Sequence, residues 1–365
     1  MQAYKAGKPI TQLLAEHQAT KHRCSRVIKL ASNENLLGPS PQISSALANQ
    51  LNALFYYPDM DGLALKEKLA EHLQCSSNML VLGNGSNDVL ELIARVFASC
   101  AEIDRLGSCI MFAQQAFIVY KLVAQAMGAE QQIIKTCNFR RDLSAYLEAI
   151  HHKTRLIFID NPNNPTGDYI PLPVLKDFIA QVPKQIIVVL DEAYKEYVAA
   201  NPATQGDEDT LQWLAQYPNL IITRTFSKIY GLAALRIGYA LCHPEIADIL
   251  NRVRQPFNVN ALALEAAKTA LADQQHIRLS QQHNQRMKEQ LEQYLQKKDW
   301  HYLPSQANFL TVHFGEQTET VYQYLLSQGV IVRPLANYAM PEYLRITLGT
   351  EADNAYLMQC LSHIS

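Results

Sequence analysis

Apolar stretches of strand length alternate with helix-like segments through the first two thirds of the chain. Residues 156–159, 186–190 and 220–222 are uncharged and rich in branched side chains, and each stretch runs directly into a polar segment. Such continuous apolar runs are typical of parallel strands that are covered on both faces. In an open α/β sheet, ligands bind at the carboxyl ends of the strands. The pattern therefore predicts an α/β sheet whose polar strand ends meet at one site.

The first two polar segments differ in character. Residues 161–167 read Asn-Pro-Asn-Asn-Pro-Thr-Gly, a dense cluster of turn-forming residues that indicates an exposed, rigid loop. The second segment begins with Asp191, which follows a buried strand directly. A carboxylate in that position is costly unless it has a cationic partner. We therefore expect Asp191 to face a positive charge.

The third polar segment combines hydroxyl groups with two cations. Thr225 and Ser227 precede Lys228, and Arg236 follows eight residues after the lysine. Hydroxyl groups and cations together suit a bound phosphate. Taken alone, a Ser-Lys pair is more typical of a solvated surface lysine. The interpretation of Lys228 as a catalytic residue therefore depends on the neighbouring segments.

A glycine-rich turn precedes a helix near residue 86. After this turn, Val89, Leu92, Ile93, Val96 and Phe97 share one face of a predicted helix. Free backbone amides at a helix amino terminus bind phosphate, and a plain N-cap is the alternative for Ser86. The residues predicted to form this phosphate cup are Gly85, Ser86 and Asn87.

The chain resembles the pyridoxal-phosphate aminotransferases of the aspartate-aminotransferase fold. The resemblance is carried, in this order, by residues 161–167, residues 191–194, Thr-Phe-Ser-Lys at 225–228 and Arg236. The resemblance implies an α/β transferase of fold type I. A large domain would hold a mostly parallel, seven-stranded-type sheet between helices, and both chain ends would form a smaller α+β domain. The implied division is an arm with part of the small domain at 1–40, the large cofactor domain at 41–255 and the rest of the small domain at 256–365.

The resemblance also implies roles for the residues at the strand ends. Lys228 would form the Schiff base with pyridoxal 5'-phosphate and then move a proton as base and acid. Asp191 would keep the pyridine nitrogen protonated. Asn164 and Tyr194 would donate to the phenolic oxygen of the ring, with a turn residue and a half-buried tyrosine as the alternative interpretations. Phe117 would stack on the ring, although the Pro-Thr that often precedes this aromatic in relatives is missing and a core phenylalanine is nearly as good an interpretation.

Segments near both ends resemble one subgroup, the histidinol-phosphate aminotransferases. Arg345 would then bind the substrate carboxylate through its bidentate fork, and Arg333 would be a second substrate cation. Tyr57 would reach the cofactor phosphate of a second subunit in a homodimer, unless it is a core tyrosine. Asn33 would lie in the amino-terminal segment over the site. The segments that carry this resemblance are residues 5–10, 30–35, 55–59 and 343–349.

Two alternatives to histidinol phosphate remain open from the sequence. An aromatic or phenylalanine aminotransferase would use the same scaffold, and a non-catalytic nucleotide-binding domain would use the glycine-rich turn as a bare anion site. A net charge of -2 argues against nucleic acid and anionic membranes as partners. No apolar stretch approaches the roughly 20 residues that span a bilayer. Seven scattered cysteines predict a reducing, cytoplasmic location, and the histidines show no metal-binding spacing.

Overall fold

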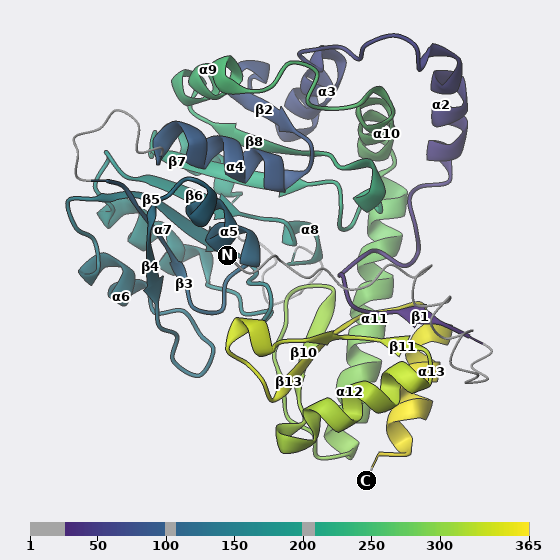
Figure 1. The fold of residues 1–365 in the computed structure, drawn as a ribbon. Coiled ribbons are helices and arrows are strands. Elements are labelled where there is room, and N and C mark those ends of the chain that lie inside the picture. The colour runs from purple at the N-terminus through teal and green to yellow at the C-terminus, as the bar shows by residue number, and fades with distance from the viewer. Residues whose placement is uncertain (1–25, 99–106, 199–208, 365) are drawn as a thin grey trace.

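The computed structural model describes residues 26–98, 107–198 and 209–364. The sequence segment 5–10, which contributed to the subgroup resemblance, lies outside these residues. Within the described ranges, no helix combines the length and the apolar character needed to cross a membrane. Figure 1 shows two packed regions, a larger one around a twisted sheet and a smaller one that contains the carboxyl-terminal end.

The larger region contains a seven-stranded sheet in the order β2-β8-β7-β6-β5-β3-β4. The strands from β7 through β4 are parallel, whereas β8 is antiparallel to both of its neighbours. Strand β2 therefore points in the same direction as β7. The expected mostly parallel, seven-stranded sheet is confirmed. The bounds are β2 (Leu80–Gly83), β3 (Cys109–Ala113), β4 (Glu130–Ile134), β5 (Thr154–Asp160), β6 (Ile187–Asp191), β7 (Leu220–Thr225) and β8 (Gly238–Cys242).

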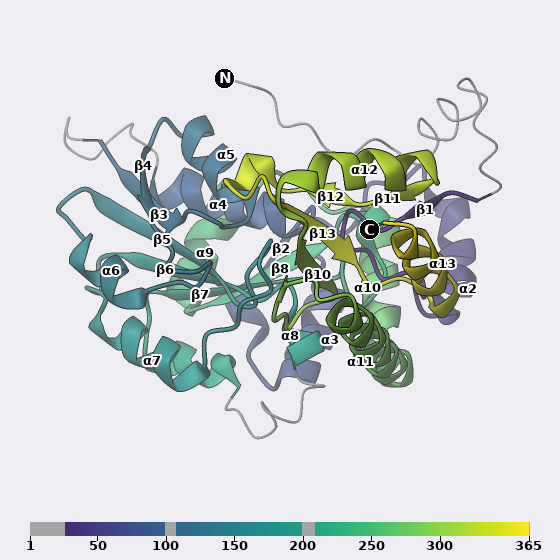
Figure 2. The same ribbon diagram turned by 90° about the horizontal axis from the view of Figure 1, so that it is seen from below.

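Helices cover both faces of this sheet, as Figure 2 shows. Helix α4 packs on β2, β7 and β8 and contacts α5 and α9, while α6 and α7 pack together. Covering both faces removes the central strands from water, which explains their continuous apolar sequences. The bounds are α4 (Ser86–Phe97), α5 (Ile118–Ala126), α6 (Leu143–Glu148), α7 (Leu172–Gln181), α8 (Lys195–Val198) and α9 (Pro244–Val253).

The smaller region is built from both ends of the described chain. Its antiparallel sheet has the order β12-β13-β10-β9, and β1 pairs in parallel with β11. Leu30 from the amino-terminal part packs in one core with Leu344 and Leu357 from the carboxyl-terminal part. The bounds are β1 (Ile28–Lys29), β9 (Tyr302–Leu303), β10 (Phe309–His313), β11 (Val330–Ile331), β12 (Arg333–Pro334), β13 (Tyr343–Thr347), α12 (Thr318–Ser327) and α13 (Glu351–Ser362).

Helix α11 (Gln274–Lys297) connects the two cores. Ile277 near its start packs in the larger core, and Met287 packs in the smaller one. The amphipathic pattern of residues 274–298 also predicts that Leu279 lies on the apolar face of this helix. This prediction is wrong, because Leu279 is 51% exposed. Two residues correspond to about 200° of helical rotation, so a side chain two positions from Ile277 points away from the core.

Helix α10 (Ala261–Ala272) packs against α2 (Gln42–Gln50) and α3 (Leu63–Leu73). Its buried alanines belong to the larger core, although the helix follows residue 255 in the sequence. The predicted domain boundaries at residues 40 and 255 stay predictions.

Candidate active site

The carboxyl ends of β5, β6 and β7 bring polar side chains together at one edge of the sheet. Asp160 lies opposite Asp191 in the register of β5 and β6, and Asp191 lies opposite Thr223 on β7. A cavity of ≈ 170 Å³ opens beside these strand ends. Its walls come from segments far apart in the sequence. They consist of Ser86, Asn87, Phe117, Asp160, Pro162, Asn164, Asp191, Ala193, Tyr194, Thr225, Ser227, Lys228 and Arg236.

One end of the cavity is suited to an anion. Gly85 caps α4 with φ = +83°, and a Cβ atom at this position would lie 2.4 Å from the Arg236 guanidinium. Nη1 of Arg236 donates a hydrogen bond to Oγ of Ser227 at 3.3 Å, and the backbone amide of Ser227 donates to Oγ1 of Thr225 at 3.1 Å. Because β2 runs in the same direction as β7, α4 starts at this edge of the sheet. The helix amino terminus, the hydroxyl groups and Arg236 therefore form an anion cradle.

Lys228 lies beside this cradle, after the end of β7. Its ammonium donates to the carbonyl oxygen of Ser32 at 3.3 Å and lies 5.6 Å from the centre of the Tyr194 ring. Burial lowers the pKa of Lys228 to about 8, and the nearby Arg345 guanidinium contributes to this shift. A lysine can act as a nucleophile or base only as the neutral amine. The environment of Lys228 therefore brings this form within reach near neutral pH.

Asp191 lies deep in the cavity with its two carboxylate oxygens in different surroundings. Oδ2 accepts a hydrogen bond from the Tyr120 hydroxyl at 3.0 Å, whereas Oδ1 is buried and has no hydrogen-bond partner among the described residues. Burial raises the pKa of Asp191 to about 7, and the Asp160 carboxylate adds to the shift. A cationic N–H group in the cavity would satisfy Oδ1 and favour the carboxylate.

Tyr194 and Asn33 are joined above the cavity. Nδ2 of Asn33 donates to the Tyr194 hydroxyl at 2.8 Å, and Oδ1 of Asn33 accepts from the Thr347 hydroxyl at 3.1 Å. Tyr194 is buried rather than half-buried, and burial raises the pKa of its hydroxyl. The hydroxyl therefore stays protonated and can donate a hydrogen bond into the cavity.

Arg345 lies on β13 and reaches the cavity loop from the smaller region. Its guanidinium donates to Oδ1 of Asn164 and to the carbonyl oxygen of Ala31, the latter at 2.8 Å, and lies 5.3 Å from the centre of the Phe309 ring. The backbone amide of Asn164 in turn donates to Oδ2 of Asp160 at 2.9 Å. The structure thus brings a buried arginine next to the loop that lines the cavity.

The comparisons with known proteins agree with this geometry. The family described as "Aminotransferase class I and II" matches residues 25–361 of the chain. The chain belongs to this family. The predicted aminotransferase family and fold type are confirmed, and the alternative of a non-catalytic nucleotide-binding domain is wrong.

Several relatives resemble this aminotransferase over nearly its whole length. It is 45% identical to "Histidinol-phosphate aminotransferase 2" of Pseudomonas fluorescens over 361 residues, which cover 99% of this chain and 94% of the relative. It is also 45% identical, with the same coverage, to "Histidinol-phosphate aminotransferase 1" of Mannheimia succiniciproducens. Among solved structures, the histidinol-phosphate aminotransferase from Sinorhizobium meliloti in complex with pyridoxal-5'-phosphate has a TM-score of 0.85 and 25% identity, covering 100% of this chain and 99% of that one.

The cavity of this aminotransferase fits pyridoxal phosphate at both ends. The anion cradle near Gly85 and Arg236 suits its phosphate group, and the unsatisfied Oδ1 of Asp191 suits its protonated ring nitrogen. Lys228 lines the same cavity. When bound, this cofactor supplies an electron sink for the substrate α-carbon. We expect the ring to be held by Phe117, Asn164, Asp191 and Tyr194, and the phosphate by Gly85, Ser86, Asn87, Thr225, Ser227 and Arg236.

Five predicted site residues of the aminotransferase are not part of the cavity lining. Three of them adjoin lining residues: Gly85 precedes Ser86, Asn33 contacts Tyr194, and Arg345 contacts Asn164. The other two are Arg333 and Tyr57. Arg333 lies directly opposite Arg345 in the pairing of β12 with β13, so both side chains project from the same face of the small sheet. Tyr57 is 82% exposed and stacks on Phe257 with ring centres 4.7 Å apart. The alternative interpretation of Tyr57 as a core residue is therefore wrong.

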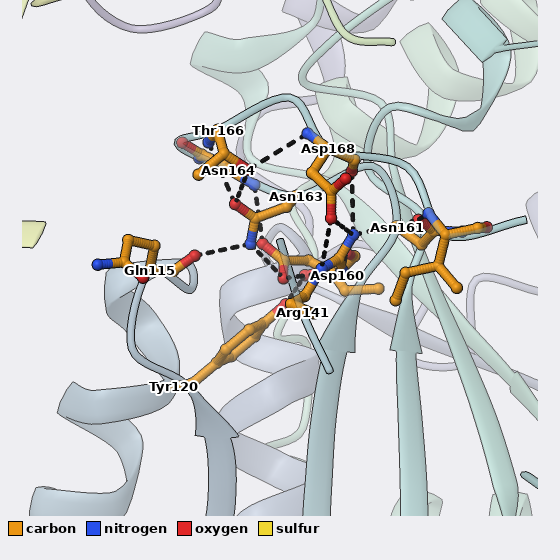
Figure 3. A network of polar contacts seen from close by, with 11 residues as sticks. Gln115, Tyr120, Arg141, Asp160, Asn161, Asn163, Asn164, Thr166 and Asp168 are labelled. Carbon is orange, nitrogen blue, oxygen red and sulfur yellow. Dashed lines mark hydrogen bonds and ion pairs between the residues drawn. The ribbon is translucent and has the colours of Figure 1, made fainter. Parts of the chain in front are cut away.

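Sequence analysis missed a polar network beneath the cavity loop, which Figure 3 shows. The side chain of Arg141 is only 1% exposed, and its Nη2 lies 3.2 Å from Oδ2 of Asp168. The same guanidinium donates to the carbonyl oxygen of Asp160 and lies 3.9 Å from its Oδ1. Nδ2 of Asn163 also donates to Oδ1 of Asp160 at 3.0 Å. An acid at the end of an apolar strand could have indicated that Asp160 needs such a partner.

Proposed function

We propose that this chain is a histidinol-phosphate aminotransferase of histidine biosynthesis. It would transfer the amino group of L-glutamate to imidazole-acetol phosphate, giving L-histidinol phosphate and 2-oxoglutarate. The observation that carries the proposal is the identity of 42–46% to relatives of that name over nearly the whole chain. The cavity around Lys228 supplies the chemistry that such a reaction needs.

Lys228 and Asp191 have different catalytic roles: Lys228 transfers a proton, and Asp191 stabilises a positive charge. In its neutral form, Lys228 accepts the proton from the α-carbon of the amino donor and returns a proton as the ammonium form. Asp191 would remain a carboxylate beside the ring nitrogen of the bound cofactor and would hold a positive charge there. Tyr194 and Asn164 would donate to the phenolic oxygen of the ring. The pKa of about 8 for Lys228 suits a group that must both accept and release a proton near neutral pH.

The two arginines on neighbouring strands suit two anionic substrates. Arg345 is buried and in contact with the cavity loop, so it would bind the carboxylate of glutamate through a bidentate contact. Arg333 is half-buried on the same face of the small sheet. It is our leading candidate for binding the phosphate ester, because it lies beside Arg345 on the small sheet.

We also propose that the enzyme works as a homodimer. Exposed aromatic and aliphatic side chains are concentrated in residues 51–63 around Tyr57, and Phe257 stacks on Tyr57. We refer to these side chains as the apolar patch, and soluble monomers rarely expose large patches of this kind. A second copy of the chain packed on this patch would bury it and would carry Tyr57 toward the cofactor phosphate of the partner. The patch consists of Leu51, Leu54, Phe55, Tyr56, Tyr57, Met60, Leu63 and Phe257.

The dimer is tested by the molecular mass in solution. Phe55 is 77% exposed, so Phe55→Glu should leave the fold intact while placing a charge in the proposed interface. Light scattering should give twice the chain mass for the unmodified protein and a smaller mass for Phe55→Glu at the same concentration. A monomeric unmodified protein would contradict the proposal. The cytoplasmic location stays a prediction.

Substrate profiling tests the proposed function directly. With L-glutamate as donor, kcat/KM should be much higher for imidazole-acetol phosphate than for phenylpyruvate. The aromatic alternative uses the same cofactor residues, so only the acceptor distinguishes it. A higher kcat/KM for phenylpyruvate would replace the proposed substrate while leaving the aminotransferase assignment intact.

A further inference from the structure

Tyr120 is a buried tyrosine that the aminotransferase mechanism described above does not use. It lies on α5 and is 0% exposed. Its ring stacks on Phe158 of β5, with ring centres 4.6 Å apart and planes 4° apart, and it meets the edge of Phe117 at 5.8 Å. Figure 3 shows the Tyr120 side chain pointing toward Asp160 and Arg141 at the ends of the strands. Packing on two sides therefore fixes the position of its hydroxyl.

The Tyr120 hydroxyl makes the two oxygens of Asp191 unequal. It donates to Oδ2 at 3.0 Å, and Oδ1 remains buried without a hydrogen bond among the described residues. Burial raises the pKa of the Tyr120 hydroxyl, so this group stays a donor. The orientation of the carboxylate is thus set from one side, and its other oxygen is left for a partner in the cavity.

Other groups face Asp191 from the neighbouring elements. Burial, and then Asp160 on β5, disfavours the carboxylate form of Asp191, while the hydrogen bond from Tyr120 favours it. Lys228 and Tyr194 also interact with its charge. The Arg141 guanidinium lies 3.9 Å from Oδ1 of Asp160. Burial and the Asp160 carboxylate thus oppose ionisation of Asp191, whereas the hydrogen bond from Tyr120 favours it.

We propose that Tyr120 is a positioning residue that holds Oδ2 of Asp191 and so presents Oδ1, as the carboxylate, to the ring nitrogen of the cofactor. This inference rests on the proposed role of Asp191. It assigns to α5 a function beyond covering the sheet. It also explains why a tyrosine rather than a phenylalanine occupies a site with no access to water.

The test compares Tyr120→Phe with Tyr146→Phe in the full-length protein. Phenylalanine keeps the stacking on Phe158 and removes only the hydroxyl. Tyr146 is a matched control because it is also buried, it packs edge-on against Phe178 at 6.0 Å, and its hydroxyl has no hydrogen-bond partner among the described residues. Both variants lose one buried oxygen atom, but only the first variant loses a donor to Asp191.

The first readout is the pH at which Asp191 is half protonated in the cofactor-free protein. Infrared spectroscopy monitors this titration through the carboxyl band that is absent in Asp191→Asn. The midpoint should lie near pH 7 in the unmodified protein. It should rise by about one to two pH units in Tyr120→Phe, as expected for the loss of one hydrogen bond to a charged group, and stay unchanged in Tyr146→Phe. The second readout is the Kd for pyridoxal phosphate, which should weaken by about tenfold or more only in Tyr120→Phe.

Two results would overturn the proposal. One concerns the role of Tyr120 alone, and the other concerns the role of Asp191. If Tyr120→Phe matched Tyr146→Phe in both the midpoint and the Kd, Tyr120 would have no positioning role. If Asp191→Asn kept the transamination rate of the unmodified enzyme, the role of Asp191 itself would fail, and the inference on Tyr120 would fail with it. A shifted midpoint and a weaker Kd in Tyr120→Phe alone support the proposal.

Discussion

Arg345 donates a hydrogen bond to Oδ1 of Asn164, a residue 181 positions away in the sequence. This contact joins a strand of the smaller region to the loop that lines the cavity of the larger region. Asn164 is expected to donate to the cofactor ring, and Arg345 is expected to bind the substrate carboxylate. A substrate that takes over the Arg345 fork would therefore release Asn164 from this contact. We therefore expect binding of the amino donor to be coupled to the cofactor loop.

Replacing Arg345 should weaken the reaction with glutamate. Arg345→Lys keeps the charge but loses the planar fork, and a hydrogen bond to a charged group contributes about 1.5 to 3 kcal/mol. The glutamate half-reaction should slow by roughly ten- to a hundredfold in single-turnover experiments, since each 1.4 kcal/mol is about a factor of ten. An unchanged glutamate half-reaction would show that the carboxylate binds elsewhere.

Asp191 is expected to be needed for keeping the cofactor ring nitrogen protonated and not for the stability of the fold. Asp191→Asn should still bind the cofactor but lose transamination by several orders of magnitude, because a neutral amide cannot keep the ring nitrogen protonated. Absorbance would follow cofactor binding, and steady-state assays would follow the rate. Transamination at the unmodified rate in this variant would mean that the acid faces a different group.

Arg333 is expected to distinguish the phosphate ester from other substrates. Arg333→Ala should weaken the half-reaction with histidinol phosphate far more than the half-reaction with phenylalanine or glutamate. Single-turnover titrations with the three amines would measure each loss separately. Equal losses for all of them would refute the division of labour between Arg333 and Arg345.

Lys228 should make the stability of the cofactor-free protein depend on pH. Its pKa is about 8 in the folded protein against an ordinary value of 10.5, so the unfolded chain binds the extra proton between these two values. Stability from this group is therefore lowest below pH 8 and rises as the pH increases toward 10.5. Lys228→Met should be more stable than the unmodified protein below pH 8, and the difference should shrink above it. Denaturant unfolding at several pH values checks this, and a difference independent of pH would contradict it.

Much of the large sheet could be predicted from the sequence. The inner parts of β5, β6 and β7, at residues 156–159, 187–190 and 220–222, are apolar throughout. Burial on both faces of a parallel sheet leaves that pattern in any chain. Their polar ends then had to meet at one edge, which predicted that Asp191 and Lys228 would share a cavity. The structure places both in its lining.

Other features depend on contacts that no local pattern records. Tyr120 occupies an apolar face of a helix and looks like a core residue until its hydroxyl is seen 3.0 Å from Asp191. Arg141 looks like a surface residue in a polar segment, yet it is buried against Asp160 and Asp168. Leu279 follows the helical period loosely and is exposed, because the period alone does not fix which face of α11 meets the core.

The central claim is that Lys228 is the residue that bonds covalently to the cofactor. Borohydride reduction of the loaded enzyme, followed by proteolysis and mass spectrometry, tests it most directly. The account predicts a phosphopyridoxyl group on the peptide that contains Lys228, and no labelled peptide in Lys228→Ala. A label on another lysine, or a Lys228→Ala variant that keeps its turnover, would contradict the account.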